Sequence, residues 1–323
     1  MREILGREPA MPLPGTVMVG PGDDAAVWRP ATGRDLVLTQ DALVEGVDFR
    51  REWTTPYLVG RRALVLSLSD LAAMGADPAW CMASICAAPS TRLDDALAIH
   101  LGITEAATET GCRLVGGDIS SIDGPLVVDV GAGGEVDAAS VLRRDGGRPG
   151  DLLAVTGVLG RAAAGLRLLG GGTAGVSIDA QDAAVWRRAQ LEPRARLAEG
   201  RRLAAAGVRC GGDLSDGLLV DARRTAVACG CRAELWLDQI PVDASLRRAF
   251  DDWAEIALGG GEDFELLVAA PEALVAAVRA DWPRRLAPLS VVGRLVEGAG
   301  VRLLDSPGGV EQPLPAARSR HFG

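Results

Sequence analysis

The chain has 323 residues and no lysine, so all 34 of its basic residues are arginine. The commonest nucleotide-binding loop ends in Gly-Lys-Ser or Gly-Lys-Thr, and Schiff-base and pyridoxal-phosphate enzymes use a reactive lysine. These chemistries are therefore excluded. If the chain handles nucleotide phosphates, arginine side chains and metal ions must supply the positive charge.

Histidine is scarce, and cysteine lacks the spacing of a metal or redox site. With only His100 and His321, an H-E-x-x-H zinc site is excluded and a Ser-His-Asp triad has little support. The six cysteines form no C-x-x-C pair, and the closest two are Cys229 and Cys231. This pattern favours buried free thiols in a reducing compartment.

Long apolar runs and excess positive charge are also missing. The net charge of −9 argues against a nucleic-acid surface, because phosphate backbones need clustered basic residues. The longest apolar region, residues 152–176, is interrupted by Arg161, Arg167 and several glycines and cannot span a bilayer. Residues 1–15 lack the apolar core of a signal peptide. We expect a cytoplasmic protein that binds neither nucleic acid nor membrane.

Acidic residues placed against small or glycine residues are the most informative feature that is present. Carboxylates on tight turns beside exposed backbone amides suit oxygen-ligated cations such as Mg²⁺ and leave the amides free for phosphate. Six segments have this character: Gly22-Asp23-Asp24, Thr39-Gln40-Asp41, Ser69-Asp70, Gly116-Gly117-Asp118, Asp213-Leu214-Ser215-Asp216-Gly217 and Gly260-Gly261-Glu262-Asp263.

Two interpretations of these segments are open. Each one alone is typical of an ordinary turn, and six such turns could be scattered over the surface without meeting. Alternatively the carboxylates converge, since four of the segments follow predicted strands or begin predicted helices. Clustered burial without cations would cost several kcal/mol per ion, so convergence would require metal.

The hydrophobic pattern predicts alternating strands and helices. In the first half we expect strands at 35–41, 112–118 and 125–136, and helices at 56–74 and 93–110, with Ser69 capping a helical turn that begins at Asp70. This α/β unit ends near residue 138. In the second half we expect a short strand within 143–160, helices at 182–190 and 194–206, a helix beginning at Ser215 and Asp216, and strands at 233–237, 264–269 and 288–296.

The wording of the acidic segments carries a family resemblance. GPGDDAAVW, TQDALVEGVDF, SLSDLAAMGADP, LVGGDIS, RRDGGRPGDLLAVTG, GGDLSDGLLVDA and GGEDFELL occur in this order. Together they resemble the thiamine-monophosphate kinases, an ATP-dependent branch of the aminoimidazole-ribonucleotide-synthetase-like superfamily. The resemblance extends from about residue 17 to about residue 270, with a weaker echo at His321-Phe322.

This resemblance implies a two-domain α/β (α+β) fold of the synthetase type. Residues 1–138 would be an α/β domain that binds ATP and Mg²⁺ and contributes strands to a β-barrel across a homodimer interface. Residues 139–323 would be an α+β domain. The implied reaction is direct transfer of the γ-phosphoryl group of ATP to thiamine monophosphate, giving thiamine diphosphate, with several Mg²⁺ ions as cofactors and no covalent intermediate.

Site residues follow from the same resemblance. The implied metal ligands are Asp24, Thr39, Gln40, Asp41, Asp70, Asp118, Asp213 and Asp216. The implied ATP contacts are Gly117, Asp118, Arg144, Ser215 and His100, although a histidine on a helix surface is an equal interpretation of His100. The implied substrate contacts are Asp48, Glu262 and Ser319.

Three of these positions depart from the family pattern. Asp48 stands where the family usually has histidine, Gln40 where it has threonine or serine, and Ser319 where it has an aromatic residue. Because two of the three face the acceptor, a superfamily relative with another acceptor is a second hypothesis. A non-catalytic paralogue that binds a nucleotide or thiamine phosphate is a third.

Overall fold

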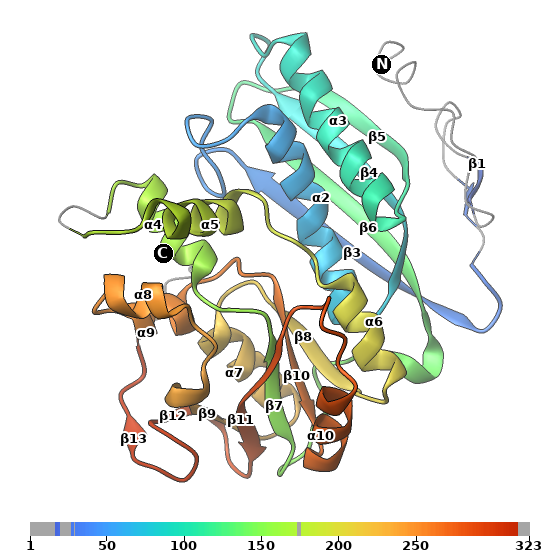
Figure 1. Ribbon diagram of the computed structural model, residues 1–323. Coiled ribbons are helices and arrows are strands. Elements are labelled where there is room, and N and C mark those ends of the chain that lie inside the picture. The colour runs from blue at the N-terminus through green and yellow to red at the C-terminus, as the bar shows by residue number, and fades with distance from the viewer. Residues whose placement is uncertain (1–16, 20–26, 29, 173–175, 316–323) are drawn as a thin grey trace. The chain divides into compact units, whose positions relative to one another are not determined.

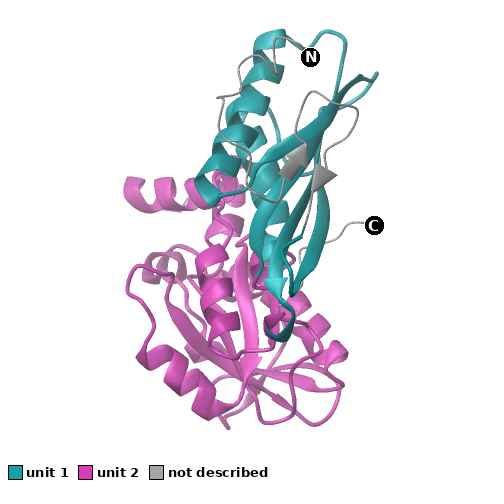
Figure 2. Ribbon diagram, turned by 90° about the vertical axis from the view of Figure 1, so that its right-hand side faces the viewer, with its two compact units in different colours: residues 1–71, 76–139 teal, residues 72–75, 140–323 magenta. Residues whose placement is uncertain are grey.

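The computed structural model describes residues 17–19, 27–28, 30–172 and 176–315. The described chain forms two compact units, coloured separately in Figure 2. Unit 1 contains the described residues up to Leu71 together with Ala76–Ala139, and unit 2 contains Ala72–Gly75 and the residues from Ser140 onward. Among the described residues, no helix combines the length and apolar character needed to cross a bilayer.

Unit 1 is built on a four-stranded sheet with the order β3-β6-β4-β5. Its strands are β3 (Arg34–Val44), β4 (Asp77–Ala87), β5 (Leu114–Ser121) and β6 (Val127–Asp137). Only β4 and β5 are parallel, because they are connected through a helix. The short strands β1 (Val17–Val19) and β2 (Val27–Trp28) form a separate antiparallel pair.

Two helices, α2 (Pro56–Ala73) and α3 (Leu93–Thr110), lie against the unit 1 sheet (Figure 1). They approach closely at reciprocal glycines: a Cβ on Gly60 would lie 2.0 Å from the carbonyl oxygen of Ile99, and one on Gly102 would lie 2.1 Å from that of Tyr57. The predicted helix at 93–110 is confirmed, including its end at Gly111, whose φ of 75° suits a left-handed C-cap.

Helix α2 corrects the prediction that Ser69 begins a helical turn. Ser69 and Asp70 lie near the end of an uninterrupted helix. Its buried Leu64, Leu68 and Leu71 repeat at helical spacing through this segment, so packing of the apolar face decides the backbone and the serine has no free amides to cap.

Side chains alternate between the two faces of the unit 1 sheet. On the helix-covered face Leu43, Val128 and Val130 are buried. The other face carries the apolar side chains of Leu36 and Leu38, which are 43% and 63% exposed. Unit 1 therefore has one apolar layer inside and a second apolar surface on the outer face of its sheet.

Unit 2 contains a seven-stranded sheet with the order β13-β12-β9-β11-β7-β10-β8. All neighbouring strands are antiparallel except β12 and β9. The strands are β7 (Leu152–Thr156), β8 (Cys210–Leu214), β9 (Arg232–Trp236), β10 (Glu265–Ala270), β11 (Leu289–Val296), β12 (Gly300–Leu304) and β13 (Glu311–Gln312).

Seven α-helices and a 3₁₀ helix accompany this sheet in the described part of unit 2, and another 3₁₀ helix lies at the boundary between the units. The α-helices are α4 (Arg161–Leu169), α5 (Ala180–Leu191), α6 (Leu197–Ala205), α7 (Leu218–Ala228), α8 (Ala244–Ala249), α9 (Trp253–Gly259) and α10 (Glu272–Ala280). The 3₁₀ helices are η1 (Ala138–Ser140), at the boundary, and η2 (Leu237–Gln239).

The main core of unit 2 lies between α7 and the sheet, where Leu218 and Ala222 pack with Leu235 and Leu295. A second core surrounds Trp186, whose ring centroid lies 5.8 Å from that of Phe250. The predicted strands at 233–237, 264–269 and 288–296 are confirmed to within a residue or two. Helix α4 was not predicted, because its glycine-rich flanks are typical of a loop.

Candidate functional site

Three predicted metal-binding aspartates lie inside regular elements and not on tight turns, which corrects the sequence-based expectation. Asp41 lies in β3, Asp118 in β5 and Asp70 in α2. Pairing of β3 with β6 and of β5 with β4 carries the two strands through Asp41 and Asp118, and the buried leucines of α2 carry the helix through Asp70. The backbone amides at these positions therefore serve mainly in the ladder or the helix.

Thr39, Asp41 and Asp70 come together on the helix-covered face of unit 1, and we call them the Asp41 cluster. The Thr39 hydroxyl donates to Oδ2 of Asp70. Burial, followed by the negative charge of Asp70, raises the pKa of Asp41 to about 6. Oδ2 of Asp41 is buried and accepts no hydrogen bond from the described residues. Neighbouring carboxylates with an open buried acceptor fit a divalent cation, which would offset the repulsion and the lost hydration.

Asp118 belongs to the opposite face of the same sheet. The register pairs Asp118 with Ser84 and Ser84 with Asp129, so these side chains share the face away from the Asp41 cluster. Asp129 accepts a 2.8 Å hydrogen bond from Nε2 of Gln40, and Asp118 accepts one of 2.7 Å from Ser120. The predicted ligands of unit 1 are thus divided between two faces.

The Asp48 carboxylate stabilises its own turn. Its Oδ2 accepts a 2.7 Å hydrogen bond from the backbone amide of Val44, and Arg62 donates to the Asp48 carbonyl at 2.9 Å. An aspartate that holds a turn in this way has a structural reason to occupy the position. Its predicted contact with substrate stays a prediction.

The remaining predicted residues of unit 1 are His100, Gly117 and Asp24. His100 is half-buried in α3, and burial lowers its pKa, so the imidazole is neutral at pH 7. Gly117 lies in β5, where a Cβ would come within 2.1 Å of the Ala83 carbonyl oxygen, so this strand contact requires glycine. Asp24 lies outside the described residues, as does Ser319 of the C-terminal segment.

In unit 2, Arg144 and Asp213 face each other across the edge of β8. Nη2 of Arg144 lies 3.6 Å from Oδ1 of Asp213, whose side chain is buried. A Cβ on Gly212 would lie 3.1 Å from Nε of Arg144, so the arginine passes over the glycine with little space to spare. Their predicted roles, ATP binding for Arg144 and metal binding for Asp213, stay predictions.

Asp216, Asp221 and Arg224 form a second charged group at the start of α7. Oδ2 of Asp221 accepts a 3.0 Å hydrogen bond from the Asp216 amide, and Oδ1 accepts a 3.0 Å bond from Nη1 of Arg224. The same Nη1 contacts Oδ2 of Asp216. Burial, and next the charge of Asp216, raises the pKa of Asp221 to about 6. The helix begins at Leu218, after Gly217, two residues later than predicted.

The segment 259–264 packs directly onto the turn that carries Ser215 and Asp216. The amide of Glu262 donates to the Ser215 carbonyl at 2.8 Å, and that of Phe264 to the Leu214 carbonyl at 3.0 Å. Glu262 and Phe264 have φ values of 68° and 48°, a region that costs non-glycine residues free energy and is found mainly at functional sites. This segment places the predicted substrate residue Glu262 beside the predicted phosphate-binding turn.

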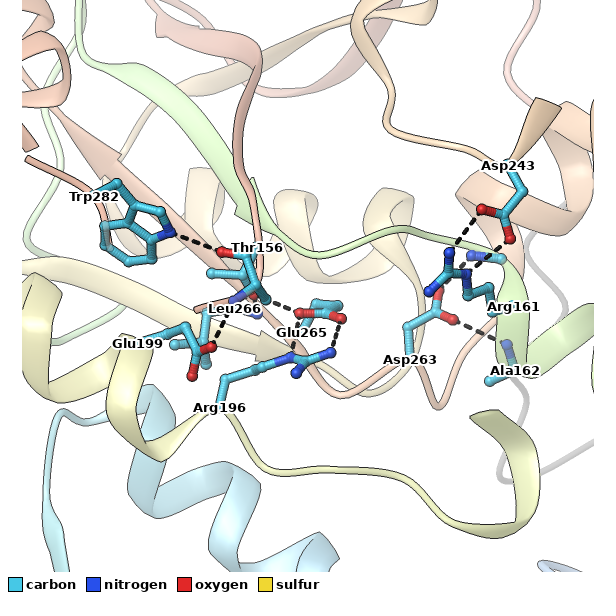
Figure 3. Close-up of polar contacts among 12 residues, drawn as sticks. Thr156, Arg161, Ala162, Arg196, Glu199, Asp243, Asp263, Glu265, Leu266 and Trp282 are labelled. Carbon is cyan, nitrogen blue, oxygen red and sulfur yellow. Dashed lines mark hydrogen bonds and ion pairs between the residues drawn. The ribbon is translucent and has the colours of Figure 1, made fainter. Parts of the chain in front are cut away.

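Hydrogen bonds of the Glu262 and Asp263 side chains hold this segment in place. Nε2 of the buried Gln190 in α5 contacts Oε2 of Glu262. Asp263 accepts hydrogen bonds from the amides of Gly160 at 2.7 Å and Ala162 at 3.1 Å, so it caps α4 from another part of the chain (Figure 3). Burial raises the pKa of Asp263 to about 7.

Sequence reasoning did not list Asp129, Asp221, Arg224 and Gln190. Asp221 lies within the quoted segment GGDLSDGLLVDA, in the first turn of the helix that follows Gly217. Arg224 follows it at the i,i+3 spacing of a helical ion pair. Asp129 and Gln190 had no comparable signal. Among the described residues, no three histidine, cysteine or acidic side chains are assembled to hold a metal ion. Any Mg²⁺ bound at these carboxylates would therefore need further oxygens beyond those of the described residues to complete its shell.

Known proteins resemble this chain along most of its length. The N-terminal domain of the AIR synthase related proteins matches residues 22–136, and their C-terminal domain matches residues 148–306. The thiamine-monophosphate kinase of Mycobacterium tuberculosis is 36% identical over 298 residues, which cover 90% of this chain and 83% of that protein.

Two solved structures share the fold. The thiamine-monophosphate kinase of Stenotrophomonas maltophilia K279a is 34% identical, with a TM-score of 0.81 and 94% of both chains covered. AaThiL complexed with AMPPCP and TMP is 29% identical, with a TM-score of 0.76, and the match covers 91% of this chain and 89% of that one.

Proposed function

Because this chain belongs to the AIR synthase related family and, within it, to the thiamine-monophosphate kinases, we propose that it phosphorylates thiamine monophosphate with ATP. The observation that carries the proposal is the similarity, at 29% identity and across nearly the whole of both chains, to a protein crystallised with AMPPCP and TMP. The products are thiamine diphosphate and ADP.

The reaction joins two phosphates. An oxygen of the acceptor phosphate bonds to the γ-phosphorus as the bond from that phosphorus to the β–γ bridging oxygen breaks. The attacking oxygen is already ionised at neutral pH, so no side chain needs to remove a proton. The protein's task is to hold several negative charges in line, and in a chain without lysine this falls to arginine, backbone amides and metal ions.

Mg²⁺, when bound, would neutralise the phosphates and orient them. Thr39, Asp41 and Asp70 fit a cation because they combine neighbouring carboxylates with a buried open acceptor. Asp213 and Asp216 offer two further buried carboxylates at one turn. We assign Asp24, Gln40 and Asp118 to the same role from the family resemblance.

The nucleotide and the acceptor would be held mainly by residues of the turns. Arg144 would bind a phosphate with its guanidinium, and Ser215 would present its hydroxyl and neighbouring amides before α7. We assign Gly117 and His100 to nucleotide binding from the family resemblance. Glu262 would attract the cationic thiazolium ring of the acceptor, and the same resemblance assigns Asp48 and Ser319 to substrate binding.

A homodimer is part of this proposal. We assign residues 1–138 to ATP and Mg²⁺ binding and to dimerisation, and residues 139–323 to the α+β domain. The outer face of the unit 1 sheet supports the dimer, because Leu36, Leu38 and Met82 leave a substantial apolar surface there. A second copy of this face would cover that surface and close the two sheets into the barrel.

A direct assay of product formation by the purified protein tests the function. ATP and Mg²⁺ are supplied with thiamine monophosphate, with thiamine, or with no acceptor, and thiamine diphosphate is quantified by chromatography. Product from the monophosphate alone is the expected result. Asp213→Ala should lower turnover at least about 100-fold, whereas the exposed Asp238→Asn should leave it unchanged.

Two other outcomes would contradict the proposal. Turnover of ATP with another phosphorylated acceptor but not with thiamine monophosphate would identify a superfamily relative with different specificity. Binding of ATP and thiamine monophosphate without any turnover would identify a non-catalytic paralogue. These two alternatives are considered because Asp48 and Ser319 replace the residues that the family usually has at these positions.

A further inference from the structure

Arg224 pairs with Asp216, a carboxylate that the proposed function assigns to a metal. Its Nη1 contacts Oδ2 of Asp216 and lies 3.0 Å from Oδ1 of Asp221. Asp221 is fixed in turn, because its second oxygen accepts the Asp216 amide at 3.0 Å. The guanidinium is therefore held by two carboxylates at the first turns of α7.

The two carboxylates in this contact are buried, whereas the arginine is partly exposed. The side chains of Asp216 and Asp221 are 11% and 3% exposed, whereas that of Arg224 is 44% exposed. A carboxylate buried this deeply needs a positive partner, and Arg224 supplies one without any metal. A divalent cation that binds Oδ2 of Asp216 competes with this guanidinium for the oxygen.

The remaining nitrogens of Arg224 point to a second role. Within the described residues, its hydrogen bonds all run through Nη1. Nε and Nη2 therefore keep their hydrogens for another acceptor, and a guanidinium binds phosphate oxygens with two such donors. The predicted phosphate-binding residue Ser215 directly precedes Asp216 in the same turn.

We propose that Arg224 is a resident counter-charge of Asp216, which weakens metal binding in the absence of nucleotide and pairs with a nucleotide phosphate once a cation takes Asp216. The proposal rests on the proposed function for the identity of the nucleotide. Metal and nucleotide would then bind together more tightly than either alone, because each removes a cost of binding the other.

The neighbouring Arg223 offers a matched control. It is exposed on the same helix turn and forms no described hydrogen bond or ion pair, so Arg223→Gln and Arg224→Gln remove the same charge from nearly the same place. Mn²⁺ binding to the nucleotide-free full chain is measured by electron paramagnetic resonance, and Mg²⁺-dependent binding of the ATP analogue AMPPCP by calorimetry.

The two arms should move in opposite directions. Arg224→Gln should bind Mn²⁺ about fivefold more tightly than wild type and AMPPCP with Mg²⁺ about fivefold more weakly. Arg223→Gln should stay within about twofold in both measurements. Arg224→Lys, which keeps a positive charge but not the planar fork, should bind Mn²⁺ like wild type and still bind AMPPCP weakly.

Equal Mn²⁺ affinity in Arg224→Gln and Arg223→Gln would overturn the proposal, as would tighter binding of both ligands by Arg224→Gln. Should Arg224→Gln fail to fold, Arg224→Lys carries the test, and loss of Mn²⁺ binding in that variant would also overturn it. Neither arm uses thiamine monophosphate or turnover. Failure of the kinase assay is therefore distinguishable from failure here.

Discussion

Arg196 and Glu265 form an ion pair through two hydrogen bonds inside unit 2, from Nε to Oε2 at 2.6 Å and from Nη2 to Oε1 at 2.5 Å (Figure 3). Thr156 donates to the same carboxylate at 2.7 Å. A Cβ on Gly157 would lie 1.9 Å from Glu265 Oε1, so only glycine leaves room for the pair. Glu265 directly follows the strained segment that carries Glu262, and the pair therefore anchors that segment.

Removal of the arginine from this pair should strongly destabilise unit 2. Arg196→Met leaves Glu265 buried with Thr156 as its described side-chain donor, and an uncompensated buried carboxylate costs about 3–5 kcal/mol. Urea unfolding followed by circular dichroism measures the change. Arg194→Met, an exposed arginine two residues away, is the control and should change the free energy of unfolding by less than about 0.5 kcal/mol.

Asp263 should make stability fall as pH rises through neutrality. Burial raises its pKa to about 7 from the ordinary 3.8, so the folded protein holds this proton where the unfolded chain has lost it. The resulting stabilisation is complete below pH 3.8 and is lost as pH rises through 7. Unfolding in urea between pH 5.5 and pH 8.5 should show a decline on the order of 1–3 kcal/mol from this group.

The variant Asp263→Asn separates this group from the others that titrate. Its amide cannot ionise, so the unfolding free energy of wild type minus that of the variant should fall as pH rises. A difference that is constant across the same range would contradict the pKa assignment. The variant also loses one of the two acceptors that cap α4, which should lower stability by about 1 kcal/mol at every pH.

The elements that the sequence did predict have local patterns. Residues 93–110 have helical periodicity and end at Gly111, and the structure has the same helix. The apolar runs of 233–237 and 288–296 predicted strands that the structure contains. These features depend on residues within one helical turn or one short apolar run, which a sequence displays directly.

The site was less accessible because its geometry depends on register and distant contacts. The motif order predicted Asp41 and Asp118 as ligands, but only the pairing of β5 with β4 shows that they lie on opposite faces. Gln190 contacts Glu262 across 72 residues, and Asp263 caps a helix more than 100 residues earlier. No local pattern records such contacts.

The proposed dimer should depend on Leu38. Its side chain is 63% exposed on the outer face of the unit 1 sheet, within the surface that a second copy would cover. Leu38→Asp should give monomers in sedimentation velocity at concentrations where wild type is dimeric, because a charge in an apolar interface is costly. Val310→Asp, on an equally exposed valine of unit 2, should leave the dimer intact. Monomeric wild type would contradict the interface.

The ionised Asp41 should lower the free energy of unfolding while it serves the proposed metal binding. Burial and the Asp70 charge raise its pKa to about 6, so the ionised Asp41 destabilises the fold increasingly as pH rises through 6. Asp41→Asn removes that charge and can donate a hydrogen bond to Asp70. Without metal, the free energy of unfolding of the variant should be about 1 kcal/mol higher than that of wild type at pH 8, and the gain should be smaller at pH 5. Its kcat/KM should fall at least about 100-fold, because the proposed metal ligand is lost. Asp35→Asn, exposed on the same strand, should change neither quantity.

An Asp41→Asn variant that keeps its activity would remove Asp41 from the metal site. Lower stability of this variant than of wild type at pH 8 would show that the described residues already satisfy the charge of Asp41.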